Sequence, residues 1–551
     1  MNRTRLMEKE EKTTYKYERL MLLALVIFSL LLFCFKLGYM SLWDNDESTY
    51  SQISREIITT GDWVTMHFRG NNWFCHPPLY FWLSAVTGKI FGFNEWAMRI
   101  WPALFGIAGV ILTFFWGKTL FNARVGFWSG LILATSLQYA GQSRMAVIDT
   151  IFCFFLSLSL FAFYRGYQTG KHYYYYLFFA SMGLAALAKG PFGIVFPFLI
   201  IIPFLMVTRE LKALKHLPWI SGIVIAAGIG FSWYFIEYMR HGRYFFDTVF
   251  VYFTWKRFFM SVQEQTGPPW FYIPVLLAGF LPWSSFLPFS IYHLSQDFKK
   301  NGKYRPMLFL FVWIVVTFVF FTLAGTKLVN YILPLFPACA LAVALWWEEK
   351  KNSAQIFVSY GFLILLSILL IISIIMYGEL KFSAAYRDIS NSMLPVGGLI
   401  FIVSAFSMVM NFRNGNNIVR KLLNSPAPLV LVMGLSFIFM FNNIAPKIEG
   451  FKPIRPLSEK LAHILTKEDN LGIYQTPGGF SLIFYTDHPV STLWTEKELE
   501  DFMNSPGKNL CVMKEEYYNQ FAGRIKAPFY LLIRQKEIVV VSNEPYSSNK
   551  E

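Results

Sequence analysis

Residues 21–47 read MLLALVIFSLLLFCFKLGYMSLWDNDE, a long apolar run that ends in an acidic turn. The run is long enough to cross the ~30 Å hydrocarbon core of a bilayer as a helix, which takes ~20 residues. Three carboxylates, those of Asp44, Asp46 and Glu47, follow it directly. Because charged side chains are costly in lipid, we expect this acidic turn to lie at a membrane interface.

The composition of the whole chain is that of a membrane protein with many spans. Of its 551 residues, 55% are hydrophobic and 15% are charged, whereas about a quarter of the residues in soluble domains are charged. The 49 Lys and Arg outnumber the 34 Asp and Glu. We attribute this surplus to cytoplasmic loops and not to a nucleic-acid partner, because most of the cations fall in alternate loops.

Thirteen apolar segments have the length of a membrane span, which predicts a polytopic α-helical membrane protein. They are residues 21–41, 97–117, 125–141, 148–165, 173–188, 192–208, 217–237, 270–292, 306–323, 329–348, 355–376, 394–411 and 427–444. The stretch 79–92 is apolar but short, so we interpret it as a re-entrant or interfacial helix. The charged tail 1–20, with no small-residue cleavage site after the first span, predicts an uncleaved signal anchor.

Basic residues in the short loops give the predicted orientation. The tail and alternate loops carry clusters of cations that belong on the cytoplasmic side, among them Lys118 and Arg124, Arg165 and Lys171, Arg209, Lys212 and Lys215, and Arg413, Arg420 and Lys421. Residues 21–444 then form the transmembrane domain, whose longest external loops are 42–96 and 238–269. The C-terminal region, residues 445–551, is external.

The C-terminal region changes in character and predicts a small α/β domain. Leucine and isoleucine recur at helical spacing over residues 457–465. Thr495 and Glu498 form a capping box that opens a second helix. Short β-rich runs predict strands at 471–475, 481–485, 509–514, 528–534 and 537–542.

Acidic residues on the predicted outer side are the candidate catalytic groups. Asp46 and Glu47 precede an expected helix at 48–58, and by themselves they would be read as its solvated first turn. Asp149, just inside the fourth span, favours a second interpretation, because a carboxylate in lipid costs on the order of 3 kcal/mol at the membrane centre and less near its edge. We therefore expect Asp149 to face a polar cavity.

Three outer segments carry cations beside glycine, proline or aromatic residues: Lys189 in 188–191, Arg257 in 255–258, and Lys327 in 324–328, which Tyr331 follows. Snorkelling to lipid headgroups explains many such lysines, but these positions oppose the positive-inside bias. Cations that converge at the outer leaflet indicate a site for phosphate or pyrophosphate. Carboxylates beside such a site predict group transfer on a phospholipid-like substrate.

The first outer loop also contains histidines. His67, His76 and the nearby carboxylates are the residues that would hold a divalent metal, although their spacing matches no metal motif. His76 precedes Pro77 and Pro78. We therefore interpret it as a rigidly presented cavity residue.

Several motifs resemble those of a known family, in order along the chain: Trp43–Glu47, Gly61–Trp63, Pro77–Trp82, Arg99, Arg144–Asp149, Leu187–Pro191, Pro282–Trp283 and Gly325–Pro334. Together they resemble the bacterial aminoarabinose lipid A transferases and the related protein mannosyltransferase-like enzymes. These are glycosyltransferases of the GT-C superfamily that use sugars linked to polyprenyl phosphate. The resemblance runs from about Trp43 to the C-terminus and implies the GT-C fold with a periplasmic α/β domain.

The resemblance also implies roles for single residues. Asp46 would be catalytic, and Asp149 and Glu47 would orient groups or bind the sugar. The residues implied to contact the donor phosphate are Lys189, Arg257, Lys327 and Tyr331. Two positions depart from the family, since His76 replaces a lysine and Thr49 replaces an arginine found in many members. These losses of fixed cations imply either a different donor or a His76 that becomes charged when phosphate binds.

The implied function is an inverting transfer of a sugar from undecaprenyl phosphate at the outer leaflet of the bacterial inner membrane. The acceptor would be lipid A or a related envelope glycolipid, or else a protein hydroxyl, as in a protein O-mannosyltransferase-like enzyme. We expect a monomer, with a divalent metal left open as a cofactor.

Two other classes compete with an enzyme. The sequence of a lipid or solute transporter is expected to contain charges near the membrane midplane and inverted half-repeats. In this sequence the charges cluster at one side of the membrane, and no inverted repeat is evident. A receptor or assembly protein would leave the paired acids and cations of the short loops unexplained.

Overall fold

A computed structural model describes residues 2–260, 265–300, 305–349, 353–380, 384–412 and 425–545. Arg413, Arg420 and Lys421, which we assigned to a cytoplasmic loop, lie outside these ranges. The chain divides into two compact units. The helical unit comprises Met1–Leu37, Phe74–Leu83 and Arg99–Ile444, and the mixed unit comprises Gly38–Trp73, Ser84–Met98 and Ala445–Glu551.

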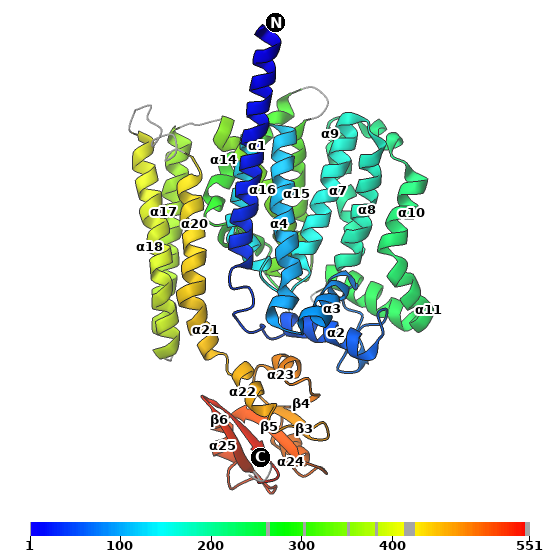
Figure 1. The fold of residues 1–551 in the computed structure, drawn as a ribbon, viewed down its shortest axis with the longest axis vertical. Helices are drawn as coiled ribbons and strands as arrows, with labels where there is room; N and C mark the ends of the chain where they lie inside the picture. Colours follow the sequence, from blue (N-terminus) through cyan, green and yellow to red (C-terminus); the bar gives the residue numbers. More distant parts are fainter. Residues whose placement is uncertain are drawn as a thin grey trace. The chain divides into compact units, whose positions relative to one another are not determined.

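Long apolar helices build the helical unit (Figure 1). The main helices of this unit among the described residues follow in chain order. They are α1 (Asn2–Cys34), α3 (Leu79–Phe91), α4 (Glu95–Leu120), α5 (Ala123–Thr135), α6 (Leu137–Gln142), α7 (Asp149–Thr169), α8 (His172–Lys189), α9 (Phe192–Val207), α10 (Trp219–Gly230), α11 (Ser232–Phe246), the π-helix η2 (Asp247–Lys256), α12 (Arg257–Phe259), α13 (Tyr272–Gly279), α14 (Leu287–Ser295), α15 (Pro306–Leu323), the 3-10 helix η5 (Val329–Leu335), α16 (Phe336–Glu349), α17 (Ser353–Leu380), α18 (Ala384–Phe412) and α20 (Ala427–Phe439). Helices α3 and α4 each begin in one unit and end in the other.

All thirteen predicted spans coincide with helical residues, but the count of spans is lower than predicted. Among the described residues, eight helices are long and apolar enough to cross a membrane, and up to ten if each of two bent pairs is one span. The bent pairs are Trp219–Gly230 with Ser232–Phe259, at 56°, and Tyr272–Gly279 with Trp283–Phe298, at 114°. Three further predicted spans do not qualify alone. Residues 125–141 are broken between α5 and α6, residues 173–188 form a helix that is too polar, and residues 192–208 form a helix that is too short.

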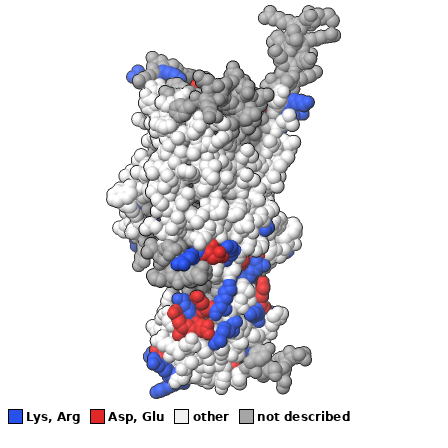
Figure 2. Space-filling view, turned by 90° about the vertical axis from the view of Figure 1, so that its left-hand side faces the viewer, with Lys and Arg blue, Asp and Glu red and all other residues white. Residues whose placement is uncertain are grey.

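The surface of the helical unit fits a lipid environment. On the face shown in Figure 2, the described side chains over the middle of this unit are almost all uncharged. Large apolar side chains of this unit, such as those of Ile220 and Leu323, are exposed. Small residues bring the helices together, as in other membrane bundles: a Cβ on Gly117 in α4 would lie 2.6 Å from the Cα of Gly126 in α5.

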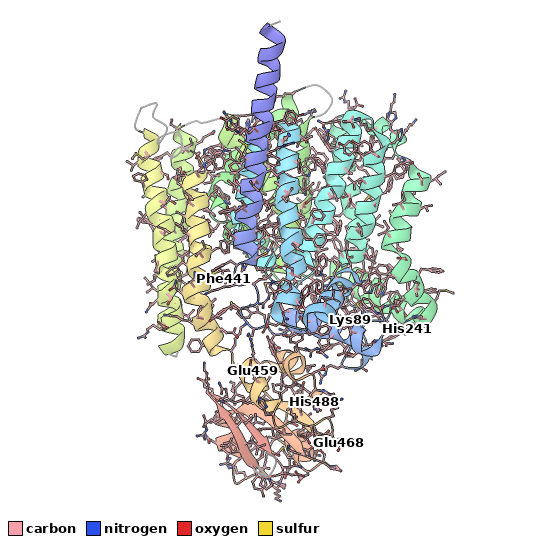
Figure 3. The ribbon with its side chains drawn as sticks, viewed as in Figure 1. Lys89, His241, Phe441, Glu459, Glu468 and His488 are labelled. Atoms are coloured by element: carbon pink, nitrogen blue, oxygen red, sulfur yellow. The ribbon has the colours of Figure 1, made fainter. Side chains whose placement is uncertain are left out.

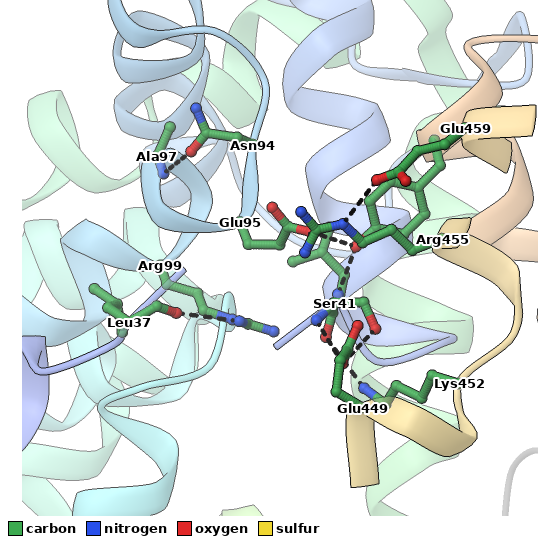
Figure 4. A network of polar contacts seen from close by, with 12 residues as sticks. Leu37, Ser41, Asn94, Glu95, Ala97, Arg99, Glu449, Lys452, Arg455 and Glu459 are labelled. Atoms are coloured by element: carbon green, nitrogen blue, oxygen red, sulfur yellow. Dashed lines mark hydrogen bonds and ion pairs between the residues drawn. The ribbon is translucent and has the colours of Figure 1, made fainter. Parts of the chain in front are cut away.

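Two arginines from the family-like motifs bind backbone carbonyls in the last turn of α1 and in the residues that follow it. Arg144 donates to the carbonyl oxygens of Leu32 at 2.7 Å and Phe35 at 2.6 Å. Arg99 donates to the carbonyl oxygen of Leu37 at 3.2 Å (Figure 4). The last carbonyls of a helix have no partners within the helix. Both side chains therefore have a structural role.

The mixed unit contains a five-stranded sheet in the order β4-β3-β5-β7-β6. β4 (Val490–Leu493), β3 (Asn470–Tyr474) and β5 (Asn509–Lys514) are parallel, and β7 (Ile538–Ser542) and β6 (Tyr530–Gln535) add antiparallel strands. Alternate residues of β5 face two separate apolar cores, because side chains alternate across a strand. The helices of the C-terminal part are α21 (Ala445–Phe451), α22 (Ile454–Leu461), α23 (Gly479–Thr486), α24 (Glu496–Met503) and α25 (Glu515–Phe521).

Most of the predicted elements of this region are confirmed. Four of the five predicted strands match β3, β5, β6 and β7 to within two residues, and β4 was not predicted. The capping box is present, with Thr495 Oγ1 accepting from the N–H of Glu498 at 3.2 Å. The predicted strand at 481–485 is wrong, because this run lies in α23.

A polar network joins the remaining parts of the mixed unit (Figure 4). Glu95, at the start of α4, accepts from Tyr485 Oη at 2.9 Å and from Arg455 at 3.1 Å. Glu449 in α21 accepts from the N–H and the hydroxyl of Ser41 at 2.9 and 3.0 Å. Ser41 and Glu95 thereby bond to α21, α22 and α23.

Candidate functional site

A cavity in the helical unit collects most of the predicted phosphate-binding residues. It contains about 940 Å³ of space not filled by protein, its open mouth included. Its walls are mainly aromatic and include Phe74, Phe192, Phe196, Trp233, Phe320 and Phe321. The polar side chains that we predicted from sequence and that line it are those of His76, Lys189, Arg257 and Tyr331.

Lys189 is presented by a tight turn between α8 and α9. The helix α8 ends at Lys189, and Gly190 follows with φ 123° and ψ −177°, a conformation essentially restricted to glycine. Pro191 then leads into α9. The two helices pack so closely that a Cβ on Gly193 would lie 2.2 Å from the nitrogen of Ala186. The motif is therefore a rigid corner with the ammonium group at its edge.

Asp149 holds this ammonium group. It is the first residue of α7, and its side chain is 4% exposed. One carboxylate oxygen forms an ion pair with Lys189, and the other accepts from Asn330 Nδ2 at 2.8 Å. We predicted that Asp149 faces a polar cavity, but it is not among the residues that line this one; its polar partners are Lys189 and Asn330. We did not single out Asn330 from the sequence, although it lies within the motif Gly325–Pro334.

The backbone at Arg257 is held in place by hydrogen bonds to a second segment of the chain. The carbonyl of Arg257 accepts from the N–H of Thr326 at 3.2 Å, and that of Phe258 accepts from Gly325 at 2.6 Å. A Cβ on Gly325 would lie 2.9 Å from backbone atoms of Met260. The glycine therefore allows the close approach that keeps Arg257 in the cavity wall.

Tyr331 lies beside both cavity cations. Its ring centroid is 5.0 Å from Lys189 Nζ and 5.9 Å from the guanidinium carbon of Arg257. Cations are attracted to the face of an aromatic ring. The three side chains therefore form one cluster, which we call the cation pair on Tyr331.

Lys327 has a different position. Its ammonium group donates to the carbonyl oxygens of Thr322 at 2.6 Å and Ala324 at 3.0 Å, where α15 ends. Burial lowers its pKa from the usual value. Lys327 is not among the residues that line the cavity, and its contacts are those of a helix C-cap.

His76 lies half-buried in the cavity wall, ahead of two buried prolines. Burial, together with the charges of Arg257 and Lys189, holds the pKa of His76 well below its usual range. The imidazole is therefore neutral in the free protein near pH 7. Charging it requires an anion that offsets the two cations.

The acidic turn belongs to the mixed unit. Asp46 is exposed and is the first residue of α2 (Asp46–Thr60). Glu47 is 1% exposed, and its carboxylate accepts from the N–H of Trp43 at 2.9 Å. Asp44 accepts from the N–H of Gly478 at 3.0 Å and that of Ser481 at 2.8 Å, at the start of α23. The three carboxylates therefore have three different environments.

Two more polar features lie apart from this turn. His67, in the hairpin of β1 (His67–Phe68) and β2 (Asn71–Asn72), belongs to the mixed unit. Glu56 bonds the tip of that hairpin through the N–H groups of Arg69 and Gly70. Among the described residues, no three His, Cys, Asp or Glu side chains gather as metal ligands would.

Known proteins share both sequence and fold with this chain. Residues 75–234 match the family model of the dolichyl-phosphate-mannose-protein mannosyltransferases. An undecaprenyl phosphate-α-4-amino-4-deoxy-L-arabinose arabinosyl transferase of Aeromonas salmonicida is 29% identical over 426 residues, 75% of this chain and 76% of that protein. The enzyme of the same name from Pseudomonas aeruginosa is 30% identical over 332 residues, 58% of each chain.

A solved structure has the same fold. The crystal structure of ArnT from Cupriavidus metallidurans, bound to undecaprenyl phosphate, aligns with a TM-score of 0.81 at 22% identity. The alignment covers 95% of this chain and 98% of that one. It confirms the predicted fold class, a polytopic helical membrane protein with a C-terminal α/β domain.

Proposed function

We propose that this chain, which belongs to the GT-C membrane glycosyltransferases related to the aminoarabinose and protein mannosyl transferases, takes its sugar from undecaprenyl phosphate. The observation that carries this proposal is the cation pair on Tyr331 in an aromatic cavity. A polyprenyl phosphate has the complementary chemistry, since it joins an anionic head to an apolar chain. The names of the aminoarabinose relatives and the ligand of the solved relative support this donor.

The cation pair would stabilise the leaving phosphate. In the reaction, the bond between the anomeric carbon and the phosphate oxygen breaks, and negative charge develops on the phosphate. Lys189 and Arg257, fixed before the reaction, would offset this charge in a site with little water. Asp149 and Asn330 keep Lys189 in place. A single displacement by the acceptor inverts the anomeric carbon.

Asp46 takes the acceptor side in this proposal, on the basis of the sequence resemblance. If the acceptor is a hydroxyl, Asp46 removes its proton as the new bond forms. If the acceptor is a phosphate, no proton has to be removed, and Asp46 positions the acceptor or stabilises positive charge on the sugar. Glu47, bonded to the N–H of Trp43, supports the start of α2.

The proposed acceptor is lipid A or a related envelope glycolipid at the periplasmic face of the inner membrane. The N-terminus is then cytoplasmic, and the C-terminal α/β domain is periplasmic, as the basic loops predict. A protein hydroxyl is the second candidate acceptor. It is favoured by the match of residues 75–234 to the protein mannosyltransferase family model.

Two experiments test the proposal. The purified protein in nanodiscs that contain lipid A should transfer the sugar to lipid A and release undecaprenyl phosphate, and Asp46→Asn should abolish this turnover while the protein stays folded. Near-normal turnover in that variant would refute the role of Asp46, and no release by the wild type with either lipid A or a protein acceptor would refute the donor. Mass spectrometry of envelope glycolipids from a deletion strain and its parent should reveal a missing sugar adduct. An unchanged lipid profile would favour a protein acceptor.

A further inference from the structure

Tyr234 brings a hydroxyl group to the cavity, and the proposed function gives this hydroxyl no role. It belongs to α11, its side chain is 4% exposed, and it lines the same cavity as Lys189 and Arg257. Its Oη atom is buried and has no hydrogen-bond partner among the described residues. A buried hydroxyl without a partner costs roughly 1–3 kcal/mol, so such groups are rare and call for an explanation.

The ring of Tyr234 is held on several sides. Its centroid lies 4.9 Å from that of Trp233, 5.7 Å from that of Phe250 and 6.2 Å from that of Phe245. Rings at these separations pack favourably against one another. The hydroxyl is therefore fixed in position before any ligand arrives.

The hydroxyl lies beside the corner that presents Lys189. A Cβ built on Gly190 would be 3.8 Å from Tyr234 Oη, with no other described atom beyond the adjacent residues within 4 Å. The N–H of Gly190 is already bonded to the carbonyl of Ala186 at 2.8 Å. The phenol is thus an additional donor next to the cation, and it adds no charge of its own.

We propose that Tyr234 Oη donates a hydrogen bond to a phosphate oxygen of the polyprenyl phosphate, as a further residue that binds the donor. This inference rests on the proposed function. An anionic oxygen is the partner that a phenol binds best, because hydrogen bonds to ionised acceptors are about twice as strong as neutral ones. The same bond explains why an unsatisfied hydroxyl is kept in an aromatic wall, since the ligand supplies the missing partner.

The test compares Tyr234→Phe with Tyr238→Phe in the full-length protein. Tyr238 lies one turn further along α11 and is 49% exposed, so its variant is a matched control. Binding of undecaprenyl phosphate without a sugar is measured in nanodiscs by native mass spectrometry. We expect the Kd of Tyr234→Phe to rise about tenfold or more, and that of Tyr238→Phe to stay unchanged. The Tm of the ligand-free Tyr234→Phe protein should not fall, because the hydroxyl has no partner to lose.

Four outcomes would overturn the inference. An unchanged Kd in Tyr234→Phe, with wild-type protein that binds, would sink this inference and leave the proposed function intact. A lower Tm with unchanged Kd would assign Tyr234 a structural role. If turnover of the sugar-loaded donor is slower but binding of undecaprenyl phosphate is unaltered, Tyr234 Oη contacts the sugar and not the phosphate. If the wild type does not bind undecaprenyl phosphate at all, the proposed function fails together with the inference.

Discussion

The carboxylate of Asp44 accepts a hydrogen bond from the backbone N–H of Ser481 at 2.8 Å, across 437 positions of sequence. Its other oxygen accepts from the N–H of Gly478 at 3.0 Å. The first N–H groups of a helix have no partners within the helix. Asp44 therefore caps α23 from the opposite end of the chain.

Loss of this cap should loosen α23. Replacing Asp44 by alanine should cost about 1 kcal/mol, and the amides of residues 479–486 should then exchange their hydrogens several-fold faster. Asp44→Asn should keep most of the protection, because asparagine also caps helices well. Glu468→Gln is the control, since Glu468 is exposed in the same domain (Figure 3). Unchanged exchange in Asp44→Ala would mean that the cap contributes nothing to α23.

Asp149 and Lys189 should act as one unit in turnover. Lys189→Met should lower kcat by roughly 10²–10³, the range seen when one charge-stabilising donor is removed. Adding Asp149→Ala to that variant should cost little more, because Asp149 acts through the ammonium group that it holds. The kinetics of the two single variants and the double variant decide this. Losses that simply multiply would show that Asp149 has a separate role.

Gly325→Ala should weaken donor binding although Gly325 does not line the cavity. The new Cβ would meet the backbone of Met260 at 2.9 Å, so the segment that carries Arg257 has to shift. We expect the Kd for undecaprenyl phosphate to rise about tenfold, which corresponds to about 1.4 kcal/mol. Gly228→Ala serves as the control, because a Cβ there meets nothing within 4 Å. Equal affinities in the two variants would contradict the positioning of Arg257 by this contact.

His76 should make the stability of the protein depend on pH. The pKa of His76 is held well below its usual range by burial and by Arg257 and Lys189. The folded protein then binds fewer protons than the unfolded chain below the ordinary histidine pKa of about 6.5. The contribution of His76 is therefore complete above that pH and is lost as the pH falls below it. Between pH 7.5 and 5, the Tm of the wild type should fall more than that of His76→Gln, and parallel curves would refute the effect.

Cys75 offers a native reporter of the cavity. It is one of the cavity-lining residues, so a bound polyprenyl phosphate should shield its thiol. In a Cys34→Ser background, undecaprenyl phosphate should slow labelling of Cys75 by an anionic thiol reagent several-fold, as peptide mass spectrometry would show. Arg257→Ala should reduce this protection because it weakens the binding of undecaprenyl phosphate. Labelling that is insensitive to the lipid would place the ligand elsewhere.

Much of the fold could be predicted because lipid imposes a simple rule. Backbone groups in hydrocarbon must be bonded internally, so long apolar runs become helices. All thirteen predicted segments are helical for this reason. Their bends and breaks could not be predicted in the same way. At the break between α5 and α6, the N–H of Leu137 donates to the carbonyl of Leu281 at 3.3 Å, within the 114° bend after α13, so contacts between distant segments accompany both features.

Some residues of the candidate site could likewise be predicted from the sequence, and others could not. Lys189, Arg257, Tyr331 and His76 could be selected from the sequence because charges and prolines stand out in apolar surroundings. Lys327 looked equivalent, but its ammonium group binds two backbone carbonyls where α15 ends. Asn330 and Tyr234 gave no signal, since amides and phenols are common beside membranes and only their neighbours give them a role.

By itself, the sequence determined the chemical inventory: which segments are apolar enough to form helices, which charged side chains interrupt them, and where a capping box opens α24. Only the tertiary structure decided which partner each group has. The apolar run 481–485 has the composition of a strand, yet it is helical. Asp44, from the other end of the chain, satisfies the N–H groups that begin the helix. A long-range hydrogen bond can outweigh local preference because β-propensity differs between residues by only about 1 kcal/mol, which is close to what one cap contributes.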